Sequence, residues 1–283
     1  MKVRIITGVV AVALFIPICI FSEYIVFPIA MAILCAIGVF EIAKCLNFHK
    51  NLIITIPMYI VALCLPIIRY KHIIPTDSKF LIIAMACAFM VLIYVLAYAT
   101  FKKNRENLSE IMMLYGMFVY VVGCFSAIVM VRYSSDGVGN FMYLLIFMGA
   151  WVSDTFAYFT GKFIGKHKLI PSVSPKKTVE GAIGGIVFTL IAFVVFGIIV
   201  RHYFSVQVPI YQFCILGIVL PIVSQIGDLI ASCVKRQYGI KDFGKVFPGH
   251  GGVLDRFDSV MLVAPTLCII DAIVNLVNGV YVL

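Results

Sequence analysis

Long apolar runs recur along this chain from one end to the other. A helix that crosses a bilayer needs about 20 mostly apolar residues, and runs of that length are difficult to bury in a soluble fold. The composition agrees, because 63% of the 283 residues are hydrophobic and only 12% are charged. We therefore predict an all-α polytopic membrane protein that forms a single membrane-embedded domain. Its nine expected spans are 4–22, 24–43, 52–68, 80–101, 111–131, 141–160, 181–200, 211–231 and 259–281.

The distribution of Lys and Arg residues predicts the orientation of these spans. With the N-terminus in the cytoplasm and the C-terminus outside, all but five of the 22 Lys and Arg residues fall on the cytoplasmic side. The net charge of +9 is then mainly a topology signal. The positive charge is also explained by anchoring to anionic lipid head groups, so nucleic-acid binding is not needed to explain it. The five outer residues are Arg69, Lys71, Lys79, Arg132 and Arg201.

Polar residues divide the chain into two parts. In 1–139 they are ordinary loop residues, and we expect these helices to form a scaffold on the lipid side. The catalytic helices and cytoplasmic loops are expected in 140–283, where the stretch 224–258 is densely polar between two apolar segments. Because charged groups in or beside a bilayer are costly, such a stretch predicts a functional site. The nine cysteines show no spacing typical of a zinc site.

Four aspartates lie near the expected inner ends of membrane spans. Asp154 and Asp228 come close to the ends of the sixth and eighth spans, which run in the same direction. Asp255 and Asp258 are three residues apart at the entrance of the last span, a spacing that places two side chains on one helical face. We expect these carboxylates to converge just below the cytoplasmic head groups. For Asp154 alone, a buried ion pair with a lysine such as Lys162 is the alternative.

Cationic residues and glycines accompany the aspartates in the stretch 224–258. Carboxylate oxygens bind Mg²⁺, whereas Lys and Arg bind phosphoryl oxygens, so the mixture predicts a site for divalent cations and phosphates. Glycines let backbone N–H groups approach an anion closely, although a flexible loop is the alternative reading for the glycines alone. These residues are Lys235, Arg236, Lys241, Lys245 and Arg256, and Gly239, Gly244, Gly249, Gly251 and Gly252.

A second polar loop, SVSPKKTVEG at 172–181, precedes the seventh span. Ser174 stands before a proline and is a reasonable helix start. Lys176 and Lys177 are open to a simple reading as lysines that snorkel to the membrane surface. Glu180 stands at the membrane edge beside them, where it can hold the lysines or a substrate hydroxyl.

Several sequence blocks together carry a resemblance to a known family. They are SCVKR at 232–236, KDFG at 241–244 and FPGHGGVLDRFD at 247–258, with GD at 227–228, SPKKTVEG at 174–181 and DTFAY at 154–158 upstream. This pattern resembles the signature of the phosphatidate cytidylyltransferases, also called CDP-diacylglycerol synthases, and we find no departure from it. The resemblance covers the C-terminal half, whereas the N-terminal helices match only in number and hydrophobicity.

The resemblance implies a Mg²⁺-dependent transfer of a cytidylyl group from CTP to phosphatidic acid in phospholipid biosynthesis. The products would be CDP-diacylglycerol and pyrophosphate, and a second metal ion is compatible with such a site. The lipid phosphate is already anionic, so it can attack the α-phosphate of CTP without a general base. The family also suggests a homodimer, and the short hydrophilic loops favour a bacterial cytoplasmic membrane.

We assign roles at this site as hypotheses. Metal ligands would be Asp228 and Asp255, with Asp258 as a further ligand or a residue that holds them. Phosphate contacts would come from Lys235, Arg236 and Arg256. Lys241 and Asp242 would form a positioning ion pair, and His250 would donate to a phosphate oxygen or to the leaving pyrophosphate. The remaining substrate-binding residues would be Asp154, Ser174, Lys176, Lys177, Glu180 and Ser232.

Two other classes of protein compete with this interpretation. A transporter or channel would also bury charges among nine helices, but its expected inverted repeats are not evident, and near the midplane only Asp271 is found. A cytidylyltransferase or kinase that acts on an isoprenoid or ether lipid is poorly separated from the first reading by sequence alone. A scaffolding protein has no reason to gather so many carboxylates and cations.

Overall fold

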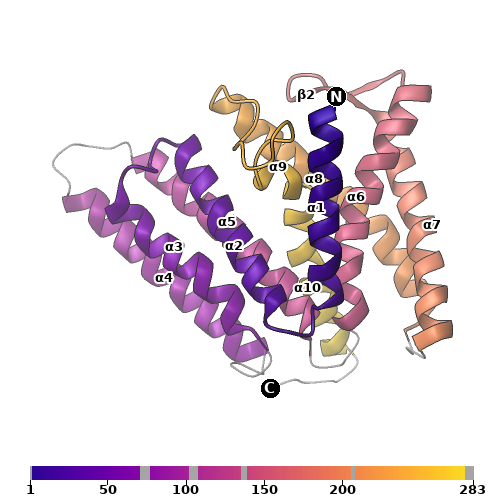
Figure 1. Ribbon diagram of the computed structural model, residues 1–283, viewed down its shortest axis with the longest axis horizontal. Helices are drawn as coiled ribbons and strands as arrows, with labels where there is room; N and C mark the ends of the chain where they lie inside the picture. The colour runs from indigo at the N-terminus through magenta and orange to yellow at the C-terminus, as the bar shows by residue number, and fades with distance from the viewer. Residues whose placement is uncertain (1, 71–76, 102–107, 135–138, 205–207, 278–283) are drawn as a thin grey trace. The chain divides into compact units, whose positions relative to one another are not determined.

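Long apolar helices make up almost the whole fold (Figure 1). The computed structural model describes residues 2–70, 77–101, 108–134, 139–204 and 208–277. Its elements in chain order are α1 (Lys2–Ile20), α2 (Val26–Cys45), α3 (Leu52–Ile68), α4 (Asp77–Phe101), α5 (Leu108–Arg132), α6 (Gly139–Ile164), β1 (Lys168–Ile170), β2 (Ser174–Thr178), α7 (Val179–Phe204), α8 (Ile210–Gln237), α9 (Leu254–Phe257) and α10 (Val260–Val277).

The long helices coincide with the apolar runs of the sequence. Among the described residues, six helices are long and apolar enough to cross a bilayer, namely α2 and α4 to α8. Three shorter apolar helical stretches are Thr7–Ile20, Leu52–Ile68 and Val260–Val274. Helices suit these runs because a helix satisfies its own backbone hydrogen bonds, which hydrocarbon cannot do. The prediction of a polytopic helical membrane protein is therefore confirmed.

The described chain divides into two compact units. The first contains α1 to α5 together with residues 240–256, and the second contains α6, the two strands, α7, α8 and α10. The change of unit after Ser135 lies close to the division at 139 expected from the sequence. The loop at 240–256, however, belongs with the N-terminal helices and not with the rest of the C-terminal half.

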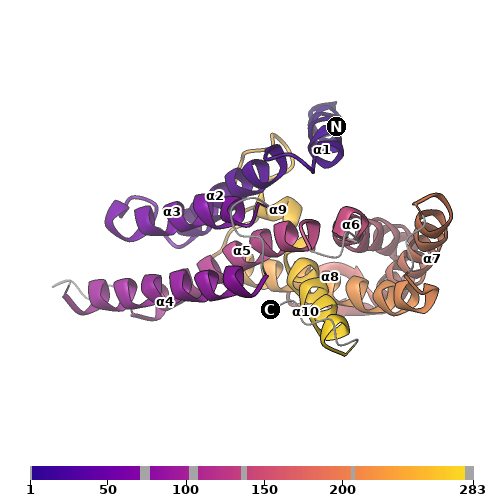
Figure 2. The same cartoon turned by 90° about the horizontal axis from the view of Figure 1, so that it is seen from below.

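In the first unit, α2, α3 and α5 pack against one another, and α4 packs along α3 and α5 (Figure 2). Phe27, Met31 and Cys35 of α2 are fully buried, and their spacing of four residues places them on one helical face. Leu114 and Phe118 of α5 are buried with the same spacing. These side chains form the apolar core of the unit, and residues 240–256 attach to it.

Two buried arginines fasten the ends of α3 and α5. Arg69 Nη2 donates to the carbonyl of Tyr133 at 2.7 Å, and Arg132 Nε donates to Ser22 Oγ at 2.8 Å. The hydroxyl of Tyr133 donates to the carbonyl of Ser22 at 2.9 Å. Because a buried polar group is costly unless it is hydrogen-bonded, these contacts make the burial of both arginines tolerable.

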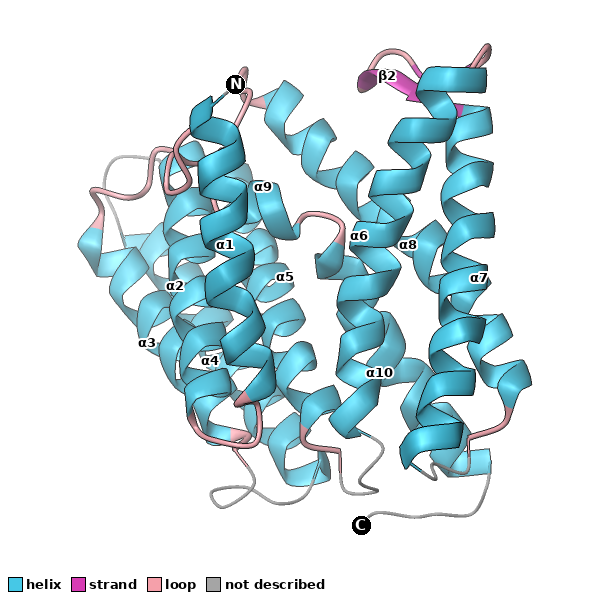
Figure 3. Ribbon diagram, turned by 45° about the vertical axis from the view of Figure 1, so that its right-hand side comes forward, coloured by secondary structure: helices cyan, strands magenta, loops and turns pink. Residues whose placement is uncertain are grey.

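In the second unit, α6, α7 and α8 pack tightly together (Figure 3). A Cβ added at Gly184 of α7 would lie 2.3 Å from Thr160 Oγ1 of α6, so a glycine is required for this close approach. Gln225 of α8 donates to Ser153 Oγ at 3.3 Å and to the carbonyl of Ala182 at 3.1 Å. One buried amide thus links all three helices, which form the frame that carries Asp154 and Asp228.

A short antiparallel hairpin, β1 and β2, connects α6 to α7 (Figure 3). Ile170 of β1 pairs with Ser174 of β2, and α7 begins only at Val179. The alternative reading of Ser174 as a helix start is therefore wrong. Ser174 pairs in the hairpin instead, and Thr178 caps α7, because its Oγ1 accepts the backbone N–H of Gly181 at 3.2 Å.

Candidate active site

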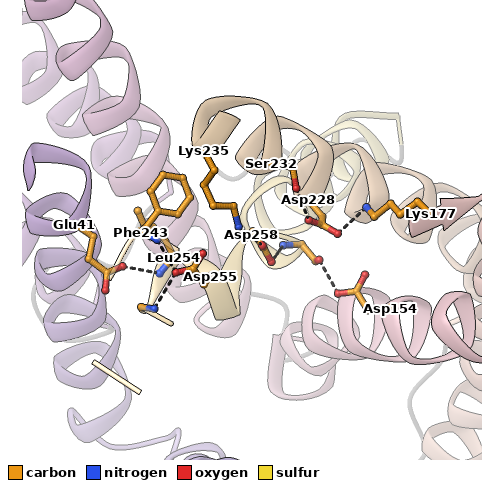
Figure 4. A network of polar contacts seen from close by, with 12 residues as sticks. Glu41, Asp154, Lys177, Asp228, Ser232, Lys235, Phe243, Leu254, Asp255 and Asp258 are labelled. Carbon is orange, nitrogen blue, oxygen red and sulfur yellow. Dashed lines mark hydrogen bonds and ion pairs between the residues drawn. The ribbon is translucent and has the colours of Figure 1, made fainter. Parts of the chain in front are cut away.

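Carboxylates and lysines are paired in the second unit (Figure 4). Lys177 Nζ of β2 lies 2.6 Å from Asp228 Oδ2 of α8. Lys235 Nζ, on the last turn of α8, lies 3.7 Å from Asp258 Oδ2, which stands in the turn between α9 and α10. Each of these predicted functional aspartates thus has a cation beside it, as expected of a site that also binds anionic phosphates.

Serines complete this cluster. Ser232 Oγ donates to Asp228 Oδ1 at 3.3 Å, one turn along α8. Ser259 donates its backbone N–H to Asp258 Oδ1 at 2.9 Å, and its hydroxyl donates to Asp154 Oδ2 at 2.6 Å. The sequence interpretation missed Ser259, although its place directly after the signature aspartate was a usable signal.

Asp154 has its observed partner within this cluster. Its carboxylate accepts the hydroxyl of Ser259, whereas the ammonium of exposed Lys162 lies 6.0 Å from the centre of the Tyr158 ring. The hydrogen-bond partner that the structure shows for Asp154 is thus Ser259 and not Lys162, the lysine considered from the sequence. Three of the four predicted aspartates, Asp154, Asp228 and Asp258, interact electrostatically in this unit.

Asp258 has an unusual protonation equilibrium. Burial raises the pKa of Asp258 to about 7, and the negative charges of Asp228 and Asp154 add to the rise. The ammonium of Lys235 and the N–H of Ser259 oppose it. The carboxyl of Asp258 therefore holds a proton through much of the acidic range, until a positive charge arrives to compensate it.

The residues of this cluster fit a magnesium ion that is bound mainly by substrate and water. Within the described ranges, no three His, Cys, Asp or Glu side chains form a metal-binding group by themselves. Mg²⁺ usually takes one or two carboxylates and completes its shell with waters and phosphates. Asp228 and Asp258 match that pattern, since a divalent cation would offset both the burial and the neighbouring negative charges that raise the pKa of Asp258.

The fourth aspartate, Asp255, belongs to the first unit and organises the loop at 240–256, which we call the signature loop. Asp255 is only 5% exposed, and its Oδ2 accepts the backbone N–H groups of Phe243 at 2.8 Å and Gly252 at 2.9 Å. The expectation that Asp255 and Asp258 share one helical face is wrong, because α9 ends at Phe257 and Asp258 lies in the following turn. The metal-ligand role of Asp255 stays a prediction.

Glu41 of α2 holds the same loop and was missed by the sequence interpretation. Its Oε1 accepts the N–H of Val253 and its Oε2 the N–H of Leu254, both at 2.9 Å (Figure 4). The view that residues before 139 contribute only ordinary loop polarity is therefore wrong. One signal was available, because a carboxylate inside an apolar run is costly and marks a site.

His250 is fixed from two sides within the loop. Thr7 Oγ1 of α1 lies 2.8 Å from its Nδ1 and also donates to the carbonyl of Pro248 at 3.0 Å. The backbone N–H of His250 donates to the carbonyl of Phe247 at 2.8 Å. Gly251 has a φ of 88°, a left-handed conformation that glycine adopts without strain. The loop is thus built from defined turns around the histidine.

Glu180 closes the hairpin. Its carboxylate accepts the backbone N–H of Lys166 at 3.1 Å and lies 2.6 Å from the ring Nδ1 of exposed His167. Its observed partners are therefore the two residues directly before β1, whereas Lys177 pairs with Asp228.

The other predicted site residues lie on the surface. Ser174 is half-buried in β2, and the exposed residues are Lys176, Arg236, Lys241, Asp242, Lys245 and Arg256. Their predicted roles in substrate binding and catalysis stay predictions.

The fold and these contacts define a polytopic membrane protein whose second unit carries a cluster of paired carboxylates and lysines. A model of the cytidylyltransferase family matches residues 2–274. A protein named phosphatidate cytidylyltransferase from Staphylococcus epidermidis is 34% identical over 272 residues, which cover 95% of this chain and 98% of the relative. Its namesake from Bacillus subtilis is 32% identical over 271 residues, which cover 94% and 96%. The namesake from Staphylococcus aureus is 34% identical over 271 residues, which cover 95% and 98%.

The chain therefore belongs to the cytidylyltransferase family and is a nucleotidyltransferase. The resemblance first seen in the signature blocks is confirmed, and it extends beyond them, because the family model begins at residue 2. The N-terminal helices, which the sequence interpretation could match only in number and hydrophobicity, lie within the region that the family model covers.

Proposed function

We propose that this protein transfers the cytidylyl group of CTP to phosphatidic acid, giving CDP-diacylglycerol and pyrophosphate. The relatives that carry the name of this activity match nearly the whole chain. The observation that carries the proposal is the pairing of Lys177 with Asp228 and of Lys235 with Asp258 in one unit. Such a cluster offers oxygen ligands to a cation and positive charge to phosphates, which both substrates contain.

The chemistry asks little of a general base. The phosphate of the lipid is anionic at neutral pH and can attack the α-phosphate of CTP directly, with pyrophosphate as the leaving group. The protein's task is then to position the two phosphates and to neutralise their charge. Lys177 and Lys235 would exchange their carboxylate partners for phosphate oxygens when substrates bind, and Ser232 would orient the carboxylate of Asp228.

Asp228 and Asp258 would hold a Mg²⁺ ion in this reaction. When bound, the ion would neutralise charge on the phosphates and help to align the attacking and leaving oxygens. Deprotonation of Asp258 would accompany binding, because its raised pKa reflects burial beside other carboxylates. A second metal ion and a role for Asp255 as ligand remain part of the same proposal.

The proposed topology has nine spans, with the N-terminus and the active site on the cytoplasmic side and the C-terminus outside. The unequal distribution of the 22 Lys and Arg residues supports it. Some of these residues, such as Lys71 and Lys102, lie outside the described ranges. A bacterial cytoplasmic membrane is the proposed location, which agrees with the bacterial origin of the relatives, and a homodimer is the proposed assembly.

The test uses purified full-length protein in detergent with labelled CTP, Mg²⁺ and phosphatidic acid. We expect labelled CDP-diacylglycerol and one equivalent of pyrophosphate, both lost in Asp228→Asn and retained in Glu110→Gln, an exposed glutamate of α5. Product formed only with an isoprenoid or ether-lipid acceptor would change the substrate and keep the reaction type. No turnover with any of these acceptors would contradict the proposal.

A further inference from the structure

Glu41 is a carboxylate inside an apolar membrane helix. It lies in α2 and is only 2% exposed, and its nearest ionisable neighbour in sequence is Lys44 at the end of the same helix. A buried carboxylate is retained only where hydrogen bonds or positive charge compensate the loss of water. The hydrogen-bond partners of Glu41 should therefore explain why a carboxylate is kept at this position.

Those contacts are backbone N–H groups of the signature loop. Each oxygen of Glu41 accepts one of them, from Val253 and from Leu254, over a separation of more than 200 residues in sequence. The preceding N–H, that of Gly252, goes to Asp255. Two carboxylates thus satisfy three consecutive backbone donors at the start of α9, where the chain has no helical acceptors of its own.

Two signature glycines are fitted to the same carboxylate. A Cβ at Gly244 would lie 2.1 Å from Glu41 Oε1, and a Cβ at Gly252 would lie at the same distance. No side chain fits at either position while Glu41 keeps its place, since Cβ contacts below 3.0 Å essentially do not occur. The requirement for glycine therefore comes from the carboxylate and not from the backbone, because neither residue has a positive φ.

We propose that Glu41 is a positioning residue that holds the signature loop. This inference rests on the proposed function and deepens it: Glu41 holds residues 243–255 in the one conformation that presents His250 to substrate. The carboxylate makes contact with loop backbone in the described structure and is shielded from solvent, so it acts through the loop. The N-terminal helices thereby contribute to catalysis indirectly, through the loop that Glu41 holds.

The decisive variant is Glu41→Gln, which keeps size and shape but replaces one acceptor oxygen by an NH₂ group that faces an N–H donor. We expect kcat to fall about 10- to 100-fold, as for a small displacement of catalytic groups, with a smaller change in the KM for CTP. Glu41→Asp, shorter by one methylene, should lower kcat by a similar factor because the aspartate cannot reach both N–H donors. Glu110→Gln is the matched control and should retain wild-type kcat.

Hydrogen exchange followed by mass spectrometry separates positioning from general stability. In Glu41→Gln, amides of 252–254 should exchange faster, whereas those of 27–35 and 114–125 should stay as protected as in wild type. Unchanged kcat, unchanged exchange at 252–254, or a loss of protection throughout α2 and α5 would each overturn the proposal.

Gly252→Ala gives an independent test from the other side of the contact. Its Cβ would displace the carboxylate of Glu41, so it should reproduce the loss of kcat, and combining it with Glu41→Gln should cost little more than the worse single change. Fully additive losses would contradict the shared origin. A wild-type protein that turns over no CTP would sink the proposed function alone, because the exchange measurement still reports whether Glu41 holds the loop.

Discussion

Lys177 Nζ and Asp228 Oδ2 lie 2.6 Å apart, which joins the hairpin strand β2 to the membrane helix α8. Both side chains are about a quarter exposed, at 25% and 23%. Lys177 Nζ itself is buried, whereas the carboxylate of Asp228 keeps access to solvent, so we expect the pair to add little net stability, about 1 kcal/mol or less. Because the pair lies in one cluster with Asp258 and Lys235, we expect it to serve substrate binding more than folding.

Replacing this lysine should separate activity from stability. We expect Lys177→Met to lower the rate of cytidylyl transfer at least about tenfold, equivalent to about 1.4 kcal/mol of transition-state stabilisation. The thermal midpoint should move by only a few degrees. Steady-state assays and thermal unfolding in the same detergent measure both quantities.

Lys168→Met is the matched control for this change, because Lys168 is exposed on the partner strand β1 and lies outside the carboxylate cluster. It should leave the transfer rate within about twofold of wild type, as surface substitutions generally do. Equal losses in both lysine variants would point to hairpin charge in general, and full activity in Lys177→Met would remove this residue from the site.

Sequence reasoning recovered the helices and missed the contacts between distant segments. The spans were predictable because membrane hydrophobicity is a local property, and 52–68 matches α3 without a shift. The link between Glu41 and Leu254 was not predictable, since nothing in either local sequence specifies the other. The hairpin was missed for a related reason: its strands are three and five residues long, too short to show a period.

The raised pKa of Asp258 predicts a pH-dependent demand for magnesium. Below about pH 7 the ion must displace a proton from Asp258, so the Mg²⁺ concentration for half-maximal rate should fall as pH rises and level off above that value. The slope for one displaced proton is about tenfold per pH unit. Magnesium titrations of the rate at several pH values measure this directly.

Asp258→Asn supplies the comparison for the pH dependence. It removes the titrating group, so its residual rate should show a flatter magnesium dependence across the same range. In the magnesium-free protein, the stability of the fold is expected to fall as pH rises. Because the folded pKa is raised from 3.8 to about 7, the proton on Asp258 stabilises the fold fully below the lower value, and this contribution is lost as pH rises through the upper one. A wild-type Mg²⁺ requirement that ignores pH would refute the assignment.

Thr7 should fix the tautomer of His250. Its single hydroxyl proton is donated to the carbonyl of Pro248, so the same oxygen accepts from Nδ1–H of the ring. In the neutral ring, Nε2 is then unprotonated and becomes a donor only when the ring is charged. Nitrogen-15 chemical shifts of labelled histidine should show protonated Nδ1, and Thr7→Val should abolish that preference.

The activity of the Thr7 variants provides a second measurement. We expect Thr7→Val to reduce kcat several-fold, because the ring loses one of its anchors, and Thr7→Ser to restore it, because serine keeps the hydroxyl. Equal kcat in the valine and serine variants would show that the contact with His250 does not matter for the reaction.

Ser259 should prove essential to the carboxylate cluster although sequence reasoning overlooked it. Its buried hydroxyl donates to Asp154 at 2.6 Å while its backbone N–H donates to Asp258, so one residue holds two of the three interacting aspartates. Ser259→Ala removes this donor to the half-buried carboxylate of Asp154 and should cost about 1.5–3 kcal/mol of stability, the usual net contribution of a hydrogen bond to a charged group. Ser259→Thr, which keeps the hydroxyl, tests whether the donor or merely the space is needed.

Combining Ser259→Ala with Asp154→Asn should restore part of the lost stability, because the negative charge that needed the donor is gone. If the double variant is less stable than Ser259→Ala alone, the hydrogen bond between these two residues is not the source of the effect.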